Sequence, residues 1–562
     1  MIKEEMPNAR FEKILLLLIL LTALVYLFTL GGYSLIDPDE GRYAEVAREM
    51  VETGDYITPH LNYVKFFDKP ALPYWLTSIS FHLFGINEFA TRLSPALLAL
   101  LGMFYLYKLA SIIYNKRAGL ITSLIIGTSL LYFLISHITI TDMPLAFFIT
   151  LSLSGFYIGY IERSRDYLLF YCGMALALLS KGLIGIIFPC GIIFWWSIFT
   201  KKWEIYKEVI TLKGIMLFFA IALPWFIIVC YKNPDFFHYF FVRQHFIRYL
   251  TTADNRYEPF WFFIPIIILG FLPWAGFIWT SFKESFLLLW TPPSKQKDSE
   301  LFLLIWFMFI FLFFSASKSK LVPYIIPVFS PLAVLVGGKI DSILSKKETL
   351  KFKTALIWNS LFLFTFSTLL LSLSFIQRDY LLGEILPISL SLFLAIGIGV
   401  FSLFIFYKKG KLKEVIIILT ILGITNCIAS HFFLNIYAEK HTSKYVATFI
   451  NYQKKPGDLI VQLKGFDQGL PFYLQERVIL LSHSNDMSFG NEHETNRFYF
   501  INTENLKKLW NSNKRIFIVA YVSQKEEIKS ISGRKVEPLI VIGNKCIYSN
   551  KPFSMKGVTQ GV

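Results

Sequence analysis

Acidic residues gather in a polar stretch that follows the first long apolar segment of the chain. This stretch, residues 36–45, holds four acids and one arginine: Asp37, Asp39, Glu40, Arg42 and Glu45. Charge is costly at a membrane surface unless it is paired, hydrated or used. A carboxylate there can act as a general base, bind a divalent cation or orient an incoming hydroxyl group. The stretch is therefore the first candidate for chemistry.

A structural explanation competes for individual acids of this group. The sequence Asp-Pro-Asp-Glu-Gly predicts a turn that leads into a helix over residues 40–53. An acid at the start of that helix would be stabilised by the helix dipole. This explanation accounts for one acid and leaves the cluster unexplained. We expect Arg42 and Glu45, three residues apart on the helix, to form a supporting ion pair.

A second polar motif, Asp68-Lys69-Pro70, has aromatic neighbours on both sides: Tyr63, Phe66, Phe67, Tyr74 and Trp75. Lys69 could grip a phosphate at headgroup depth, with Asp68 as its partner or as a cation ligand. The alternative is a lysine that reaches outward from an aromatic belt at the membrane interface. Pro70 is expected to start the next helix.

Two further charged residues stand at the ends of apolar segments. Asp142, in residues 141–144, lies at the outer end of the fourth predicted span, where a lone acid is usually functional. A helix cap ahead of Pro144 is the structural alternative. Lys181 lies between two apolar runs that are almost continuous, and Gly182 permits the tight turn that this arrangement requires.

Basic residues also occur in two later outer segments. His245 and Arg248 are three apart, so on a helix they would share a face suited to a phosphate, or to a cation and a phosphate. One histidine is weak evidence for a metal, and an interfacial helix is the alternative. Residues 315–327 place Lys320 and Tyr324 beside prolines that break helix geometry, which indicates an anion pocket.

The composition indicates a membrane protein with many spans. Of 562 residues, 55% are hydrophobic, 57 are Phe and only 17% are charged, which excludes an ordinary soluble domain. The net charge of +16 does not indicate nucleic acid binding, because Lys and Arg cluster in short loops between apolar runs. The five cysteines are scattered without a CxxC motif, so we expect neither a disulfide framework nor a thiolate metal site.

Apolar runs recur from residue 14 to about residue 433 and predict about thirteen transmembrane helices. Their centres lie near residues 22, 100, 127, 149, 174, 191, 221, 270, 307, 329, 364, 396 and 423. Alternate loops are rich in Lys and Arg, and such loops face the cytoplasm. This pattern places the N-terminus in the cytoplasm. It places the first loop, residues 31–88, and everything after the last span on the outer side.

The character of the chain changes near residue 434. Short β-branched and aromatic runs predict five strands, at residues 458–463, 477–481, 497–501, 515–522 and 538–542. Polar segments between them predict helices at residues 443–452, 503–511 and 523–530. We therefore divide the chain into a transmembrane catalytic domain, residues 1–433, and a small extracytoplasmic α/β domain, residues 434–562.

Taken together, the motifs resemble the GT-C membrane glycosyltransferases, in particular the lipid A aminoarabinose transferases and the dolichyl-phosphate-mannose protein mannosyltransferase superfamily. The motifs that carry the resemblance follow in the expected order, at residues 37–45, 67–75, 141–144, 180–182 and 317–327. The resemblance implies a mainly α-helical GT-C fold. It also implies inverting transfer of a sugar from a polyprenyl carrier, undecaprenyl phosphate, on the periplasmic face of the inner membrane.

The resemblance also implies roles for individual residues. Asp39 would be the principal catalytic acid, and Asp142 would be the second carboxylate. The donor phosphate would be held by Lys69, Lys181, Arg248, Lys320 and Tyr324. Asp68 and His245 would bind a divalent cation, either Zn²⁺ or Mg²⁺/Mn²⁺. The family more often has Glu at the position of Asp68, so the carboxylate arm is shorter here.

These residues predict an enzyme that moves a sugar onto lipid A or another envelope glycolipid. An acceptor hydroxyl would need a base, and Asp39 is placed to be one, whereas an acceptor phosphate would need none. Asp37 and Glu40 are then left as turn and helix-start residues. Two alternatives remain: transfer to a protein Ser or Thr, and a flippase for a lipid-linked anion. Against the flippase, the charges gather at one face, and no paired discontinuous helices recur in the two halves.

Overall fold

The computed structural model describes residues 8–163, 167–241, 257–346, 348–376, 382–481, 499–533 and 536–551. Over these residues the chain is mainly helical and forms two compact units. The helical unit contains Met1–Gly32, Asp68–Leu76 and Arg92–Ile436. The α/β unit contains Tyr33–Phe67, Thr77–Thr91 and Tyr437–Val562. Residues of the first loop therefore share a unit with the C-terminal residues.

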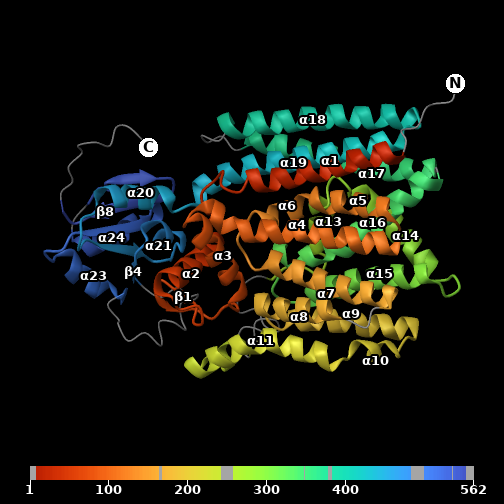
Figure 1. The fold of residues 1–562 in the computed structure, drawn as a ribbon. Coiled ribbons are helices and arrows are strands. Elements are labelled where there is room, and N and C mark those ends of the chain that lie inside the picture. Colours follow the sequence, from red (N-terminus) through yellow and green to blue (C-terminus); the bar gives the residue numbers. More distant parts are fainter. Residues whose placement is uncertain are drawn as a thin grey trace. The chain divides into compact units, whose positions relative to one another are not determined.

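The helical unit is built from long apolar helices that lie side by side (Figure 1). Its first half contains α1 (Asn8–Phe28), α4 (Glu88–Ile113), α5 (Lys116–Gly127), α6 (Leu130–Ser136), α7 (Asp142–Glu162), α8 (Leu168–Lys181), α9 (Ile184–Thr200), α10 (Ile205–Val209) and α11 (Leu212–Lys232). Its second half contains α13 (Phe263–Gly270), η2 (Ala275–Phe277), α14 (Ile278–Leu288), α15 (Lys295–Ala316), η3 (Val322–Val328), α16 (Phe329–Lys346), α17 (Thr349–Ile376), α18 (Leu382–Lys408) and α19 (Leu412–His441).

Many of these helices could cross a membrane, as the apolar runs predict. Among the described residues, nine are long and apolar enough, and two bent pairs, α5 with α6 and α13 with α14, pass the same test together. The apolar helices α8 and α9 are shorter. Each of the thirteen predicted centres falls on one of these helices. The polytopic architecture is confirmed, with nine to eleven candidate spans by length and composition.

Burial separates central helices from peripheral ones. The most apolar window of α7 is 83% buried and that of η3–α16 is 89% buried, whereas the windows of α1, α17 and α18 are each 28% buried. A helix that is apolar all round must be covered by protein or by lipid. The α7 and η3–α16 segments therefore form the interior of the unit, and the other three offer their apolar surface to lipid.

The α/β unit combines the first loop with a six-stranded sheet. The first loop contributes α2 (Asp39–Thr53), β1 (His60–Leu61) and β2 (Val64–Lys65), and α3 (Leu72–Phe84) has residues assigned to each of the two units. The C-terminal residues contribute α20 (Lys444–Gln453), β3 (Leu459–Leu463), α21 (Gly469–Leu474), β4 (Ile479–Leu481), β5 (Phe500–Ile501), α23 (Thr503–Trp510), β6 (Ile516–Tyr521), η6 (Val522–Gln524), α24 (Lys525–Ser532), β7 (Ile540–Ile542) and β8 (Lys545–Ser549).

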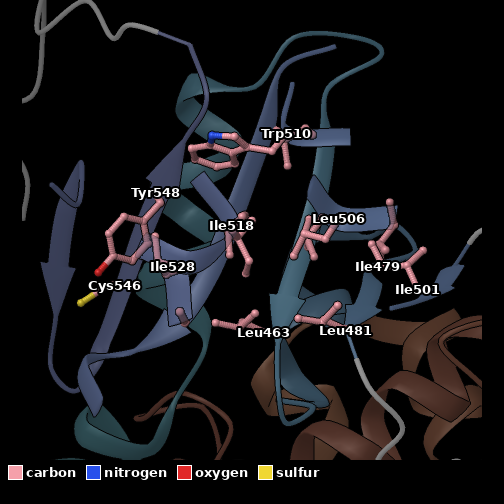
Figure 2. Close-up of a cluster of buried hydrophobic side chains, with 14 residues drawn as sticks. Leu463, Ile479, Leu481, Ile501, Leu506, Trp510, Ile518, Ile528, Cys546 and Tyr548 are labelled. Atoms are coloured by element: carbon pink, nitrogen blue, oxygen red, sulfur yellow. The ribbon is translucent and has the colours of Figure 1, made fainter. Parts of the chain in front are cut away.

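The strand order of the sheet is β5-β4-β3-β6-β8-β7. The first four strands in this order are parallel, and β8 and β7 pair in antiparallel fashion. Parallel strands require buried faces, which explains their β-branched and aliphatic sequences. Figure 2 shows one such face, where Leu463, Ile479 and Ile518 of the strands pack with Leu506 and Ile528 of the covering helices.

Most elements of this unit match the predictions, but the short elements β1, β2, α21, η6 and β8 do not. The five predicted strands appear as β3 to β7, and the three predicted helices appear as α20, α23 and α24. Strand β8 and helix α21 were not predicted. The short sequence Lys-Cys-Ile-Tyr-Ser of β8 carries a weak strand pattern, and its place in the sheet comes from pairing with β6 and β7. The proposed boundary at residue 433/434 stays a prediction, although the α/β unit also includes Tyr33–Phe67 and Thr77–Thr91, which contain most of the first loop.

Candidate functional site

Three of the predicted site residues meet inside the helical unit. Asp142 is the first residue of α7 and Lys181 is the last residue of α8, and the two helices pack against each other. Lys181 Nζ lies 2.5 Å from Asp142 Oδ1, and both side chains are about nine-tenths buried. Segment η3 packs against α7 and places the ring of Tyr324 at 4.4 Å from Lys181 Nζ. The structure thus joins an acid, a cation and an aromatic ring from three separate segments.

This arrangement is an anchored cation. A buried ammonium group requires a partner of opposite charge, and the aromatic ring adds a further favourable interaction. Gly182, with φ of +86°, ends α8 directly after Lys181 in a conformation that favours glycine. Since the lysine terminates a helix and its charge also complements the helix dipole, its position is well determined.

Lys69 and Asp68 form a second ion pair of the helical unit. Lys69 Nζ lies 2.8 Å from Asp68 Oδ2 and 2.9 Å from the Asp68 carbonyl oxygen. The two side chains are 16% and 14% exposed, so the pair is partly shielded. Helix α3 begins at Leu72, two residues after Pro70, close to the predicted start. The expected partnership of the two residues is therefore present.

Lys320 is held by the backbone of its own surroundings. Its Nζ donates to the carbonyl oxygens of Glu258 at 2.7 Å and Ser317 at 2.6 Å, and the side chain is buried. The ammonium group also lies 5.9 Å from the ring centroid of Tyr257. These contacts brace the segment that leads into η3. The predicted contact of Lys320 with the donor phosphate stays a prediction.

Asp39 belongs to the α/β unit and is open to solvent. It is the first residue of α2, its side chain is 62% exposed, and its Oδ1 lies 3.9 Å from Arg42 Nη1. Glu40 beside it is buried and accepts a hydrogen bond from the Ile36 N–H at 3.0 Å, as expected of a helix-start residue. The two neighbouring acids thus differ in accessibility, and Asp39 is the one that can meet a substrate.

A buried network of charged side chains stabilises α2 farther along the helix. Arg48 donates to both carboxylate oxygens of Glu45, at 2.6 and 2.8 Å, and it also pairs with Glu52 at 2.6 Å. The Tyr63 N–H donates to Glu49 Oε2 at 2.9 Å, which ties α2 to the turn between β1 and β2. Sequence reasoning missed Arg48, although the Glu45-x-x-Arg48 spacing was a usable signal.

The structure shows that Asp37 is more than the turn residue that the sequence predicts. Its side chain is buried, and it accepts hydrogen bonds from Ser443 Oγ at 2.5 Å and from the Gly469 N–H at 2.6 Å. Lys545 Nζ lies 3.9 Å from it. These partners come from the C-terminal part of the chain, so local sequence could not reveal them. Burial raises the pKa of Asp37 from its ordinary value of 3.8 to about 6; Lys545 opposes this effect and Asp467 adds to it.

The raised pKa of Asp37 predicts a pH-dependent effect of replacing it. Between about pH 4 and pH 6 the folded protein binds a proton that the unfolded chain has released, so stability falls as pH rises through this range. Asparagine at this position cannot ionise. We expect the difference in Tm between Asp37→Asn and the native protein to become more favourable to the variant from pH 4 to pH 7.5. Scanning fluorimetry at both pH values checks this, and a difference that is independent of pH would contradict the assignment.

His245 and Arg248, predicted to hold a cation and the donor phosphate, lie outside the described residues. Within the described part of the chain, no group of three or more His, Cys, Asp and Glu side chains gathers as a metal site. Asp68, the other predicted metal ligand, is paired with Lys69. The structure therefore brings Asp142, Lys181 and Tyr324 together, pairs Asp68 with Lys69, and places Asp39 in the other compact unit.

Comparison with known proteins identifies similar families and a similar fold. Residues 68–228 match the family model of dolichyl-phosphate-mannose-protein mannosyltransferases, and residues 446–544 match that of the aminoarabinose transferase C-terminal domain. The crystal structure of ArnT from Cupriavidus metallidurans bound to undecaprenyl phosphate superposes with a TM-score of 0.82 at 24% identity, over 95% of this chain and 98% of that one. The chain has the ArnT fold. The resemblance seen in the motifs is confirmed.

Several curated relatives of this ArnT-fold chain share an enzyme name. The undecaprenyl phosphate-alpha-4-amino-4-deoxy-L-arabinose arabinosyl transferase 1 of Proteus mirabilis is 33% identical over 342 residues, which is 59% of this chain and 60% of that protein. The transferase of the same name from Aeromonas hydrophila is 32% identical over 367 residues, 64% of this chain and 66% of that protein. The matched region thus spans about 60% of the length of the first of these relatives.

Proposed function

We propose that the chain is an integral-membrane glycosyltransferase. It moves a sugar from undecaprenyl phosphate to lipid A or another envelope glycolipid, with inversion at the sugar carbon. The observation that carries the proposal is the buried group of Lys181, Asp142 and Tyr324 in a chain with the ArnT fold. An anchored cation at the end of an apolar helix suits an anionic headgroup whose lipid tail lies among helices.

The proposed residue roles follow from the chemistry of the leaving group. Transfer breaks the bond between the sugar carbon and a phosphate oxygen, so negative charge grows on the phosphate. Cations that neutralise this charge lower the barrier. Lys69 and Lys181 supply them, together with Arg248. Asp39 acts as general base where the acceptor is a hydroxyl group.

The proposed location is the inner membrane, with the N-terminus in the cytoplasm and the α/β unit in the periplasm. Support comes from the Lys- and Arg-rich alternate loops, which favour the cytoplasmic side. The exposed acid of α2 and the sheet of residues 459–549 would then meet a substrate that has already crossed the membrane.

Mass spectrometry of lipid A and other envelope lipids, with and without the gene, tests the function. Gain of one sugar on a glycolipid, lost in the deletion strain and restored by the native gene, is the expected result. Labelled glycoprotein with unchanged glycolipids would instead assign a protein acceptor. Flipping of a fluorescent lipid phosphate in proteoliposomes, with no transfer, would assign a flippase.

A divalent cation is proposed from the sequence as a further phosphate partner. A Zn²⁺, Mg²⁺ or Mn²⁺ ion held by Asp68 and His245 would stabilise negative charge on the donor phosphate. We expect EDTA to lower the transfer rate of the purified enzyme, and one of these ions to restore it. Full activity in EDTA, with no bound metal detected by elemental mass spectrometry, would contradict this role. The lysine roles proposed above do not depend on the ion.

A further inference from the structure

A buried charge cluster lies at the base of the first loop, within the α/β unit. We call it the Asp37 anchor, and it consists of Asp37, Ser443, Asp467, Tyr521 and Lys545. Lys545 Nζ lies 3.0 Å from Asp467 Oδ2, 3.0 Å from Ser443 Oγ and 3.9 Å from Asp37 Oδ2. The Tyr521 hydroxyl donates to Asp467 Oδ1 at 2.6 Å. Two carboxylates therefore share one ammonium group away from solvent.

The anchor lies at the point where the strand order of the sheet reverses. Strand β3 leads through α21 to β4 on one side, while β6 pairs with β3 on its other side. Asp467 follows the carboxyl end of β3, and Tyr521 is the last residue of β6. Lys545 is the first residue of β8 and pairs with Tyr521 of the neighbouring strand β6. Parallel sheets commonly bind ligands at this position. Here the carboxylate of Asp37, from the first loop, occupies it.

Two glycines bring the first turn of α2 onto this end of the sheet. A Cβ atom on Gly41 would lie 2.3 Å from the Gly469 nitrogen and 2.4 Å from Asp37 Oδ1. A Cβ atom on Gly469 would lie 2.5 Å from the same oxygen. All three distances are shorter than real Cβ atoms show, so only glycine permits this approach. Helix α2 and helix α21 are therefore in direct backbone contact.

The anchor also fixes the main chain just before Asp39. The Asp37 N–H donates to the carbonyl oxygen of His441 at 2.9 Å, and the Arg42 N–H donates to the carbonyl oxygen of Pro38 at 3.1 Å. Asp39 lies between these bonds, two residues after Asp37. Its own side chain is exposed, so the position of its carboxylate depends on the backbone that carries it.

We propose that the Asp37 anchor is a positioning device for Asp39. The C-terminal part of the chain uses the ligand-binding edge of its sheet to hold the first turn of α2, and thereby places the exposed carboxylate for the acceptor. This inference rests on the proposed function, in which Asp39 is the base. It assigns the α/β domain a role in catalysis, and the motifs of the first loop do not indicate this role.

The test compares three variants of the full-length protein in detergent or nanodiscs. Asp37→Ala removes every contact that the Asp37 carboxylate makes in the anchor and leaves the contacts among Ser443, Asp467, Tyr521 and Lys545 in place. Ser443→Ala removes one donor to that carboxylate, and Asp37→Asn keeps an oxygen for the Gly469 N–H. We expect kcat to fall at least tenfold in Asp37→Ala, with the KM for the donor within about threefold of native, because the lysines that bind phosphate are unchanged. Asp37→Asn should restore most of kcat, and Ser443→Ala should lie between.

Hydrogen exchange supplies a readout that does not depend on the reaction. Amides of residues 36–45 should exchange faster in Asp37→Ala than in the native protein, while amides of β6 remain protected as a control for folding. Native kcat together with native exchange in Asp37→Ala would overturn the inference. Native kcat with faster exchange would equally overturn it, because the anchor would then hold the loop without serving catalysis.

The same experiment separates failure of this inference from failure of the proposed function. A native protein without any sugar transfer would refute the function, and exchange alone would then report on the anchor. If Asp37→Ala does not fold, as loss of β6 protection would show, Ser443→Ala and Asp37→Asn carry the comparison. Equal kcat and equal exchange in those two variants and the native protein would reject a positioning role.

Discussion

Replacement of Asp39 by asparagine is expected to reduce kcat by about 10²- to 10⁴-fold, the usual contribution of a positioned base. The KM for the lipid-linked donor should change little, because Asp39 belongs to no ion pair closer than 3.9 Å among the described residues and the phosphate is assigned to lysines. Asparagine has nearly the same shape, so the start of α2 should be preserved. Initial rates of sugar transfer at several donor concentrations measure both constants.

The adjacent acid provides the matched control. Glu40 is buried, and its carboxylate accepts a hydrogen bond from the Ile36 N–H, which the amide oxygen of glutamine can also accept. We expect Glu40→Gln to retain kcat within about threefold, since its role is to start the helix. Native activity in Asp39→Asn, combined with loss of activity in Glu40→Gln, would show that the catalytic acid has been assigned to the wrong position.

Separation of Asp142 from Lys181 is expected to have the second largest effect. Asp142→Asn leaves the buried ammonium group without its carboxylate, and Lys181→Met leaves the buried carboxylate without its cation. Removing one partner of a buried ion pair typically costs about 3–5 kcal/mol. The double variant removes both charges and should be destabilised by much less than the sum of the two single changes. Unfolding followed by Tm or denaturant midpoint completes this double-mutant cycle.

Activity distinguishes a binding role of the pair from a purely structural one. If Lys181 neutralises the donor phosphate, the double variant should fold well yet transfer sugar poorly, with a raised donor KM or a lowered kcat. The pair Lys202–Asp298 of the same unit serves as a control, because it is more exposed, at 37% and 15%, and has no assigned role in transfer. A double variant with native kinetics would reduce the Asp142–Lys181 pair to a structural contact.

Local patterns were sufficient for much of the fold. Long apolar runs predict membrane helices because lipid demands both an apolar surface and internally satisfied backbone groups. Each of the predicted span centres accordingly lies on a helix. Helix α2 was predicted at residues 40–53 and runs from Asp39 to Thr53, since its polar start and its glycine end are local signals.

Apart from the adjacent pair Asp68 and Lys69, the candidate site was predicted as residue types and not as partners. Asp142 and Lys181 stood out because lone charges beside apolar runs are rare, but 39 positions separate them in the chain. The sequence does not indicate that the packing of α7 against α8 brings the two side chains to hydrogen-bonding distance. It also does not indicate that the ring of Tyr324 lies close to the lysine. Nor does the expected ion pair of Arg42 with Glu45 indicate that Arg48 contacts both carboxylate oxygens of Glu45. The Arg42–Glu45 pair stays a prediction.

The sequence by itself determined that this is a membrane protein with many spans, that its motifs resemble those of GT-C glycosyltransferases, and which charged residues deserve mutation. Composition and short motifs depend on residues that are close together in the sequence, so they can be interpreted without a structure. Only the tertiary structure shows that Asp37, which lies in the predicted turn before α2, also has its side chain buried against the C-terminal part of the chain. Its partners Ser443, Gly469 and Lys545 lie more than 400 positions away, and burial beside them, which no local pattern encodes, determines both its pKa and its role.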